Sequence, residues 1–324
     1  MLKAFITPAN AVASAFSFMQ SSLTGKLSVA GMPMSVSFEL TNTCNLNCPE
    51  CITGSGRMSR GKGFMDPELF GRIIRELKPY IFYLSLYFQG EPMLHPEFFS
   101  ILGRCRGIST TVSTNGHFLS EENSEELAKS DLKKLVVSLD GMDQGTYSLY
   151  RVNGDLGRVK KGIENMVSAI RKCRSKLKLE IQFLVNSFNE KQIHEAARYS
   201  RTMNARLKLK SMQISESEDY EKWLPSIEKY RRYKLRNGEY VIKSSLPNRC
   251  ARLWFNPVIT WDGKVLPCCF DKDGEYIMGD LNEDSFGEIW NGPKYRSFRK
   301  SILTGRKMIG ICRNCTSGLR GAAV

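Results

Sequence analysis

The sequence lacks any run of 18 or more uninterrupted apolar residues, and this absence excludes a helix that crosses a bilayer. The closest approach to a targeting signal is AFITPANAVASAFSFMQ, directly after Lys3. Its apolar character is broken by Pro8, Asn10, Ser14 and Ser17. We therefore interpret it as a surface or capping segment. A signal peptide and an amphipathic segment that touches a membrane are the less favoured interpretations.

Acidic side chains are outnumbered, since 33 Asp and Glu stand against 47 Lys and Arg and give a formal net charge of +14. Clustered basic residues are typical of phosphate binding. Here they are spread through stretches that we expect to be helical, such as GRVKKGIENMVSAIRKCRSK and EKYRRYKLRNGEY. The second stretch mixes both signs, as solvated helix faces do. We therefore do not expect a nucleic-acid partner.

The chain has ten cysteines, but it lacks the even spacing of cysteines that a disulfide framework would show. Eight of them fall into two tight groups, which are Cys44, Cys48 and Cys51, and Cys250, Cys268, Cys269, Cys312 and Cys315. Cys105 and Cys173 stand alone in predicted helices, where we interpret each as a small buried apolar residue. Tight groups in a long chain indicate metal sites in a reducing compartment, so we expect a cytoplasmic protein.

Short β-rich runs alternate with longer amphipathic stretches from Ser35 to Ile214. The runs are SVSFEL, FYLSLYF, TTVST, KLVVSLD, LKLEIQFLV and LKLKSMQI. One helical stretch is DPELFGRIIRELK, with Asp66 as N-cap and Pro67 at the first helical position. Six alternations predict βα units and a parallel sheet, but they are too few to close an eightfold barrel. We therefore predict an α/β fold with a partial (β/α)6 barrel.

The first cysteine group lacks a fourth ligand nearby, because the nearest histidine, His95, belongs to another segment. Three soft thiolates suit an iron–sulfur cluster or zinc, but a structural zinc site needs four protein ligands. A 4Fe-4S cluster on three cysteines keeps one iron open. The group follows the first strand, and reactive groups collect at such strand ends. The spacing C-x3-C-x2-C in this context resembles the radical SAM superfamily, in which the open iron takes the amino and carboxylate groups of S-adenosylmethionine.

Residues at other strand ends extend this resemblance. QGEP at 89–92 is similar to the G-G-E-P motif of the family, although alone it is equally an ordinary turn. The resemblance implies that its glutamate accepts hydrogen bonds from the methionine ammonium, which has only donors. STNG at 113–116, and Ser138 with Asp140, resemble ribose and carboxylate contacts. The implied cofactor-binding residues are Gln89, Gly90, Glu91, Pro92, Ser113, Asn115, Ser138, Asp140 and Arg151.

The chain departs from the family pattern at Glu50, where relatives often have an aromatic residue near the adenine. The placement of the adenine therefore does not follow from the resemblance. Cys44, Cys48 and Cys51 are the implied ligands of the cluster that binds S-adenosyl-L-methionine.

The pattern changes after Asn248. NPVITWDGKVLPCC predicts a hairpin that turns at Asp262 and Gly263. SFGEIWNGPKYRSFRKSIL predicts one helix, with Ser285 as N-cap and Glu288 completing a capping box. Four cysteines on this hairpin and a following loop can saturate a cluster or a zinc ion, so a zinc ribbon stays open as an alternative. These four are Cys250, Cys268, Cys312 and Cys315.

This stretch resembles the SPASM and twitch extensions of radical SAM enzymes, including a G-x4-C step from Gly263 to Cys268. A full SPASM domain carries more cysteines and a further cluster, so the chain resembles the shortened form with one auxiliary 4Fe-4S cluster. The step favours Cys268 over the adjacent Cys269 as ligand. We divide the chain into an N-terminal capping segment (1–34), a radical SAM core (35–214), a helical connector (215–247) and an auxiliary cluster domain (248–324).

The resemblance implies a radical SAM oxidoreductase with two 4Fe-4S clusters, which cleaves S-adenosylmethionine to a 5'-deoxyadenosyl radical, abstracts a substrate hydrogen and passes an electron to the auxiliary cluster. We expect dehydrogenation of an alcohol or sugar-like small molecule, with a flavodoxin or ferredoxin-type electron donor. Only 34 residues precede the first strand, which is short for a peptide-recognition domain. Radical modification or cross-linking of a peptide or RNA, and a non-catalytic zinc-binding module, are the alternatives.

Overall fold

We describe residues 2–215 and 219–315 of a computed structural model, with side chains from residue 7 onward. The chain forms two compact units. The first comprises the described residues of Met1–Thr43, Ser59–Thr111 and Leu246–Ser317, and the second comprises those of Cys44–Met58 and Val112–Ser245. Positions 1, 216–218 and 316–324 of the predicted N-terminal segment, connector and C-terminal domain lie outside the described residues. The predicted domain boundaries stay predictions.

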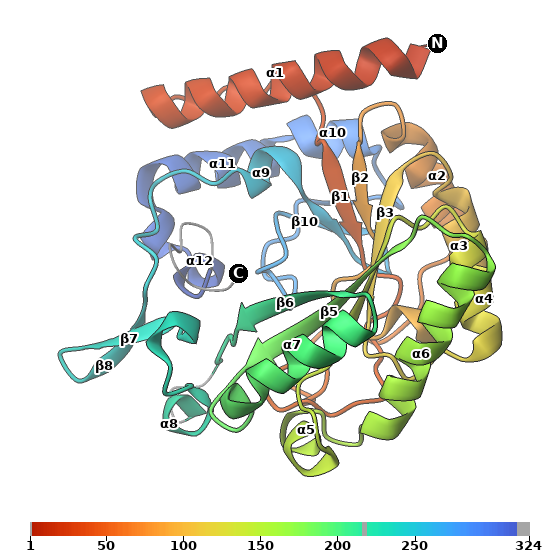
Figure 1. The fold of residues 1–324 in the computed structure, drawn as a ribbon. Helices are drawn as coiled ribbons and strands as arrows, with labels where there is room; N and C mark the ends of the chain where they lie inside the picture. The colour runs from red at the N-terminus through yellow and green to blue at the C-terminus, as the bar shows by residue number, and fades with distance from the viewer. Residues whose placement is uncertain (1, 216–218, 316–324) are drawn as a thin grey trace. The chain divides into compact units, whose positions relative to one another are not determined.

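The first unit is built on a sheet with the strand order β11-β10-β9-β1-β2-β3 (Figure 1). Strands β1 to β3 are parallel, with Val36 opposite Leu84 and Leu84 opposite Thr110. The predicted C-terminal hairpin is confirmed, because β9 and β10 pair antiparallel, and β9 also joins β1 in parallel. The bounds are β1 Ser35–Phe38, β2 Tyr83–Ser85, β3 Ser109–Thr114, β9 Val258–Ile259, β10 Lys264–Leu266 and β11 Gly279–Asp280.

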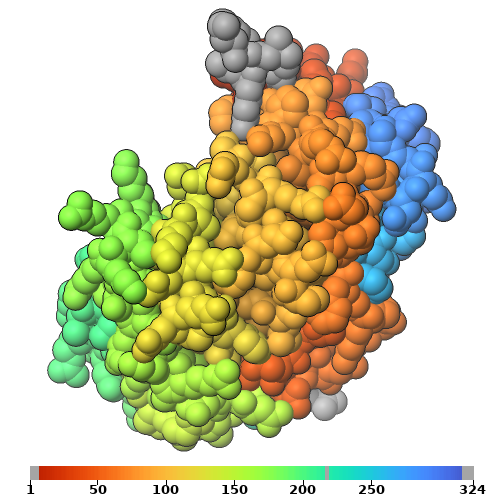
Figure 2. All heavy atoms as spheres, turned by 90° about the vertical axis from the view of Figure 1, so that its right-hand side faces the viewer, coloured from red at the N-terminus to blue at the C-terminus, as the bar shows by residue number. Residues whose placement is uncertain are grey.

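The helices of the first unit begin where the sequence offers caps. Asp66 accepts hydrogen bonds from the backbone of Glu68 and Leu69, and Pro67 occupies the first turn of α2, as predicted. Figure 2 shows the face of the protein that includes α2 and α3 (orange). Arg104, the last residue of α3, pairs with Glu68 of α2. The bounds are α1 Leu2–Thr24, α2 Pro67–Leu77, η1 Pro92–Leu94, α3 Phe98–Arg104, α9 Arg252–Phe255, α10 Phe286–Asn291, α11 Pro293–Gly305, η5 Arg306–Met308 and α12 Gly310–Arg313.

The segment predicted as one helix after Ser285 consists of two. The capping box of Ser285 and Glu288 is present and starts α10. The helix stops at Gly292, which is extended, and α11 starts at Pro293. Proline has no N–H to donate and its ring clashes with the preceding turn, so the single-helix prediction was wrong at this point.

The second unit contains three parallel strands in the order β4-β5-β6, with Val137 opposite Ile181 and Ile181 opposite Leu207. All six predicted strands of the core are therefore present. The bounds are α4 Glu121–Lys129, β4 Lys134–Ser138, α5 Gln144–Tyr150, α6 Leu156–Lys172, β5 Lys178–Val185, η2 Glu190–Gln192, α7 Ile193–Thr202, β6 Arg206–Ser211, α8 Tyr220–Trp223, η4 Glu228–Tyr230, β7 Tyr233–Arg236 and β8 Glu239–Ile242.

The connector predicted as helical contains a hairpin. β7 and β8 pair antiparallel around Asn237 and Gly238, whose φ angles are 49° and 81°. An Asn-Gly pair with positive φ at both positions is the preferred two-residue hairpin turn. The helical interpretation of EKYRRYKLRNGEY followed its mixed charges and missed this turn signal.

The two isolated cysteines differ in burial. Cys105 is 2% exposed after α3, and burial raises its pKa to about 12. Cys173 ends α6 and is only partly buried, so the prediction of a buried residue was wrong there. No helix among the described residues is long and apolar enough to cross a membrane.

Candidate cofactor sites

The first cysteine group lies in a loop of the second unit that follows β1 in the chain. Cys48 is buried, and Cys44 and Cys51 are partly buried. The loop is held by hydrogen bonds from Asn47 N to Val152 O (3.1 Å) and from Cys51 N to Cys48 O (3.2 Å). A hydrophobic cluster that includes Tyr150 and Trp223 packs behind the three thiols. The thiols are thus backed by apolar side chains on one side.

Asn115 is oriented toward this cysteine loop. Its amide nitrogen donates to Asn45 Oδ1 at 2.7 Å and lies 3.9 Å from Cys44 Sγ. His117 Nε2 accepts from Asp155 N, so the ring proton sits on Nδ1 and donates to Asn115 Oδ1. Burial, and then the charge of Arg158, lower the pKa of His117 and favour this neutral form. His117 therefore fixes which end of the Asn115 amide meets Cys44.

Arg151 is held beside Cys48 by a buried carboxylate. Asp140 is fully buried, and its Oδ2 accepts from Arg151 Nε and Nη2 at 2.6 Å each. Its other oxygen accepts from Leu184 N at 2.6 Å. Arg151 Nη1 then lies 3.7 Å from Cys48 Sγ. Burial raises the pKa of the Cys48 thiol, and the Arg151 guanidinium opposes that increase. Both oxygens of Asp140 thus act within the protein, and its predicted contact with the cofactor stays a prediction.

The QGEP loop lies in the first unit, after β2. Gly90 has φ +72°, and a Cβ there would lie 2.4 Å from Thr41 O and 2.6 Å from Thr43 O. The position therefore admits only glycine without a shift of the backbone. The next residue, Glu91, donates its N–H to Thr43 O at 2.8 Å. Its buried carboxylate accepts from Met93 N at 3.2 Å and so caps η1.

Replacing Glu91 by Gln tests the role implied for its charge. The Gln oxygen can still cap Met93, so we expect unchanged iron content and thermal stability. Loss of a charged acceptor for the methionine ammonium is expected to weaken binding of S-adenosylmethionine by about tenfold or more. Equilibrium binding to the anaerobically reconstituted protein measures this, with the exposed Glu97→Gln as the matched control. Iron loss, or unchanged affinity, in Glu91→Gln would contradict the assignment.

The remaining predicted cofactor residues lie at strand ends, as expected. Gln89 and Pro92 flank the Gly90 turn and are buried. Ser113 lies near the end of β3, and Ser138 is the last residue of β4. Their contacts with the cofactor stay predictions.

Four cysteines of the C-terminal region are buried in the first unit: Cys250, Cys268, Cys312 and Cys315. Burial raises the pKa of Cys250, of Cys268 and, to about 11, of Cys312. Neighbouring thiols add to each increase, with Cys315 acting on all three. The structure thus brings together the four residues that the sequence proposed as auxiliary ligands.

Two arginines accompany these thiols. Arg306 is 1% exposed and its Nη2 donates to Cys315 Sγ at 3.4 Å. Arg252 Nη1 donates at 3.3 Å to Cys269, the adjacent and only partly buried cysteine. Cys268 and Cys269 both follow β10, which ends at Leu266. Their different surroundings therefore come from a turn and not from a strand.

The donor sets fit iron–sulfur clusters. Neighbouring thiolates repel one another, and this repulsion raises the pKa of each thiol. Positively charged metal ions remove the repulsion when they replace the thiol protons. Three cysteines with a neighbouring arginine in one loop, and four buried cysteines in the other unit, are thiolate sets of the kind that clusters use. Among the described residues, no three His, Cys, Asp or Glu side chains lie close enough to hold one metal ion. The assignment of individual cysteines as ligands stays a proposal.

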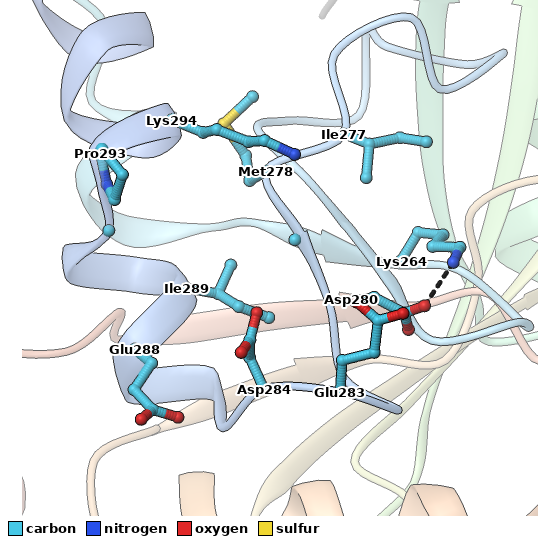
Figure 3. A pocket seen from close by; sticks show the side chains of 12 residues that line it. Lys264, Ile277, Met278, Asp280, Glu283, Asp284, Glu288, Ile289, Pro293 and Lys294 are labelled. Carbon is cyan, nitrogen blue, oxygen red and sulfur yellow. Dashed lines mark hydrogen bonds and ion pairs between the residues drawn. The ribbon is translucent and has the colours of Figure 1, made fainter.

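A cavity of about 520 Å³ lies elsewhere in the C-terminal region (Figure 3). Its lining contains several carboxylates but no cysteine. Asp280 pairs with Lys264, and Glu288 bonds to Ser285 in the capping box. These groups are already used within the fold, so we assign no cofactor to this cavity.

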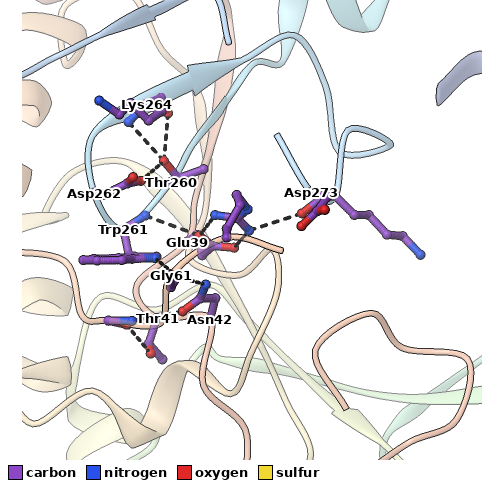
Figure 4. Close-up of polar contacts among 12 residues, drawn as sticks. Glu39, Thr41, Asn42, Gly61, Thr260, Trp261, Asp262, Lys264 and Asp273 are labelled. Atoms are coloured by element: carbon purple, nitrogen blue, oxygen red, sulfur yellow. Dashed lines mark hydrogen bonds and ion pairs between the residues drawn. The ribbon is translucent and has the colours of Figure 1, made fainter. Parts of the chain in front are cut away.

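The carboxylate of Glu39, directly after β1, contacts the turn of the C-terminal hairpin at Trp261 (Figure 4). Glu39 is fully buried and accepts from Arg60 Nη1 and Nη2 at 2.8 and 2.7 Å. It also accepts from Trp261 N at 3.4 Å, in the turn of the hairpin. Burial raises the pKa of Glu39, and Arg60 opposes the increase. The hairpin that leads to Cys268 is thus tied by polar contacts, as well as by strand pairing, to β1.

Residues 38–200 match the Radical SAM superfamily, and residues 250–316 match SPASM, an iron–sulfur cluster-binding domain. The chain therefore belongs to the radical SAM superfamily. Its C-terminal region is a SPASM domain, and the predicted fold class is confirmed. These two domains imply S-adenosyl-L-methionine and two 4Fe-4S clusters as the cofactors.

Curated relatives resemble the chain over most of its length. It is 25% identical over 316 residues, 86% of either chain, to the tungsten-containing aldehyde ferredoxin oxidoreductase cofactor-modifying protein of Pyrococcus furiosus. It is 24% identical to mycofactocin maturase MftC of Mycobacterium ulcerans, covering 87% of this chain and 80% of the relative. It is 23% identical to the S-adenosyl-L-methionine-dependent 2-deoxy-scyllo-inosamine dehydrogenase of Niallia circulans, covering 87% and 92%.

Solved structures share the fold. BtrN in complex with AdoMet and 2-DOIA has a TM-score of 0.53 at 18% identity, covering 88% of this chain and 93% of that one. Streptococcus suis SuiB bound to precursor peptide SuiA has a TM-score of 0.63 at 17% identity, covering 94% and 74%.

Sequence reasoning missed the residues that orient the sites. His117 stands two positions after Asn115, and Arg252 two positions after Cys250, so proximity in sequence was an available signal. Arg306 and the Glu39–Arg60 pair are brought to their partners only by the fold. No local pattern could have revealed them.

Proposed function

We propose that the protein is a radical SAM oxidoreductase that dehydrogenates an alcohol or sugar-like small molecule. The observation that carries the proposal is the second thiol group. Cys250, Cys268, Cys312 and Cys315 are each buried. As the four ligands of one cluster, they would leave no open iron for the substrate. A saturated cluster suits electron acceptance. The zinc-module alternative has no support from the family membership.

The cofactors, when bound, would supply a 5'-deoxyadenosyl radical and an acceptor for one electron. Removing a hydrogen atom, an electron and a proton from a carbinol group gives a carbonyl, so the balance is a two-electron oxidation. Cys44, Cys48 and Cys51 would hold the first cluster, and Arg151 would place a fixed positive charge beside Cys48. Asp140 keeps that guanidinium in position, and His117 keeps the amide of Asn115 turned toward Cys44.

Similarity to the 2-deoxy-scyllo-inosamine dehydrogenase over most of both chains supports an amino-cyclitol or related alcohol as substrate. A second candidate is oxidation or cross-linking of a peptide, favoured by the shared fold of SuiB in its complex with precursor peptide SuiA. RNA modification has no such support. A flavodoxin or ferredoxin-type electron donor and a cytoplasmic location remain part of the proposal.

The experiment is a deuterium-transfer assay with anaerobically reconstituted protein. Amino-cyclitols and sugar alcohols deuterated at the carbinol carbon are supplied with S-adenosylmethionine and a chemical reductant. We expect deuterium in 5'-deoxyadenosine and one ketone product per cleavage event, measured by mass spectrometry. Cleavage that no alcohol stimulates, together with oxidation of a peptide supplied in parallel, would replace the dehydrogenase with the peptide candidate. Zinc in place of iron in the anaerobically purified protein would exclude both candidate reactions.

A further inference from the structure

The N-terminal helix α1 turns its polar side toward the first unit. Short polar side chains recur every three or four residues on this side, and all are buried: Thr7, Asn10, Ser14, Ser17 and Ser21. A surface helix ordinarily buries an apolar stripe and exposes its polar face. The orientation of α1 is therefore the reverse of the usual one.

Specific hydrogen bonds hold this orientation. Asn10 Nδ2 donates to Met32 O at 3.0 Å, and its Oδ1 accepts from Met32 N at 2.7 Å. Ser14 donates to the same carbonyl at 2.8 Å, and Thr7 donates to Pro79 O at 2.6 Å. Ser21 exchanges two bonds with the backbone of Ser28. A rotation of α1 that buried its apolar side would break these hydrogen bonds. The bonds therefore keep the apolar side exposed.

The outer stripe, which we define as Val12, Phe16, Met19 and Leu23, faces away from the unit. These side chains are 70%, 58%, 52% and 77% exposed, and their spacing of four, three and four residues places them on one side of the helix. Pro8, Ala9 and Ala15 are exposed as well. Isolated exposed apolar residues are common, but a continuous stripe marks an interaction surface.

The charges on α1 and on α11, a helix of the same unit, are of one sign. Residues 1–38 contain Lys3 and Lys26 and no Asp or Glu, and Glu39, the first acidic residue, is fully buried. α11 of the same unit contains no acidic residue and exposes Lys294, Arg296 and Lys300. With a formal net charge of +14, the protein complements an anionic surface.

We propose that α1 docks the protein on an anionic lipid bilayer, with the outer stripe inserted among the headgroups. A helix with an uninterrupted apolar face and too little hydrophobicity to span is suited to lie in the membrane interface. Neighbouring lysines and arginines would add attraction to acidic lipids. Phe18 packs on Trp254 and Phe255 of α9, so α1 is anchored to the first unit.

A second copy of the chain is the less suitable partner for this stripe. Stable protein interfaces use about 20–30 residues on each side, whereas the stripe offers four large side chains. Two copies would also bring two positively charged bodies together.

Vesicle flotation of the full-length, cluster-loaded protein tests the proposal. We expect binding to phosphatidylcholine vesicles that contain phosphatidylglycerol, weaker binding at high salt, and little binding to phosphatidylcholine alone. Phe16→Glu should reduce binding to the mixed vesicles by about tenfold or more, because a charge replaces the phenyl ring that would insert among the headgroups. Gln20→Glu, the same charge change on an exposed polar neighbour, should stay within about twofold of the unchanged protein.

Both positions are exposed, so we expect neither substitution to change thermal stability. Thermal unfolding of both variants checks this. Absence of binding to every vesicle would overturn the proposal. So would a dimer, seen by sedimentation, that Phe16→Glu dissociates while no vesicle is bound. Equal loss of binding in both variants would show that charge alone, and not the stripe, makes the contact, and would remove the insertion of α1. Each outcome is read without substrate turnover and is independent of the proposed reaction.

Discussion

Replacing Cys44, Cys48 and Cys51 together by Ala is expected to remove about half of the iron and all reductive cleavage of S-adenosylmethionine. The three thiols lie in one loop of the second unit, whereas the four auxiliary cysteines are buried in the first unit. Loss of one cluster should therefore leave the ligands of the other unaltered. Iron and sulfide analysis, and detection of 5'-deoxyadenosine after reduction, measure the two effects.

Cys173→Ala is the matched control for this variant. Cys173 is a partly buried cysteine of the same unit that ends α6 and belongs to neither group. Its replacement should change neither iron content nor cleavage. Cleavage retained in the triple variant would show that the cofactor cluster is elsewhere, and loss of all iron would show that the two clusters are not independent.

Much of the fold could be predicted because its signals are local. Alternation of β-rich and amphipathic runs gave the six core strands, and Asp66 with Pro67 marked the start of α2 through hydrogen bonds within one turn. The capping box at Ser285 is equally local. One error arose because a local signal was overlooked, namely the Asn237–Gly238 pair of the hairpin turn. Another arose because the burial of Cys173 was inferred from its residue type alone.

The candidate sites divide in the same way. The cysteine spacing and the QGEP turn are sequence patterns, and Gly90 confirms why one of them needs glycine. The groups that orient these patterns come from distant segments. Arg151 reaches Cys48 across about a hundred positions, and Glu39 meets Trp261 only after the hairpin has paired with β1. Such contacts depend on tertiary packing, which periodicity does not encode.

Reversed burial in α1 shows a further limit. The serines and asparagine that interrupt its apolar run are buried, because they donate hydrogen bonds to backbone carbonyls of residues 28–32 and 80. A polar side chain can be buried when it is satisfied, so polarity alone did not identify the solvent-facing side.

Cys268→Ala is expected to abolish the auxiliary cluster signal and to slow substrate oxidation by about tenfold or more, while Cys269→Ala behaves nearly as the unchanged protein. Cys268 is buried with Cys250 and Cys315, and burial, followed by the neighbouring Cys269, raises its pKa well above the usual range. Cys269 is only partly buried. The two adjacent thiols therefore form a matched pair in which one has the surroundings of a ligand.

Iron content and electron paramagnetic resonance after reduction distinguish the two variants, and cleavage of S-adenosylmethionine without substrate serves as the internal control. That cleavage should survive both changes, because the cysteine loop of the second unit is intact in each. Loss of the auxiliary signal in Cys269→Ala with an intact signal in Cys268→Ala would reverse the assignment. If neither variant lost the signal, the second cluster would not use this turn, and the electron acceptor in the proposed dehydrogenation would have to be found elsewhere.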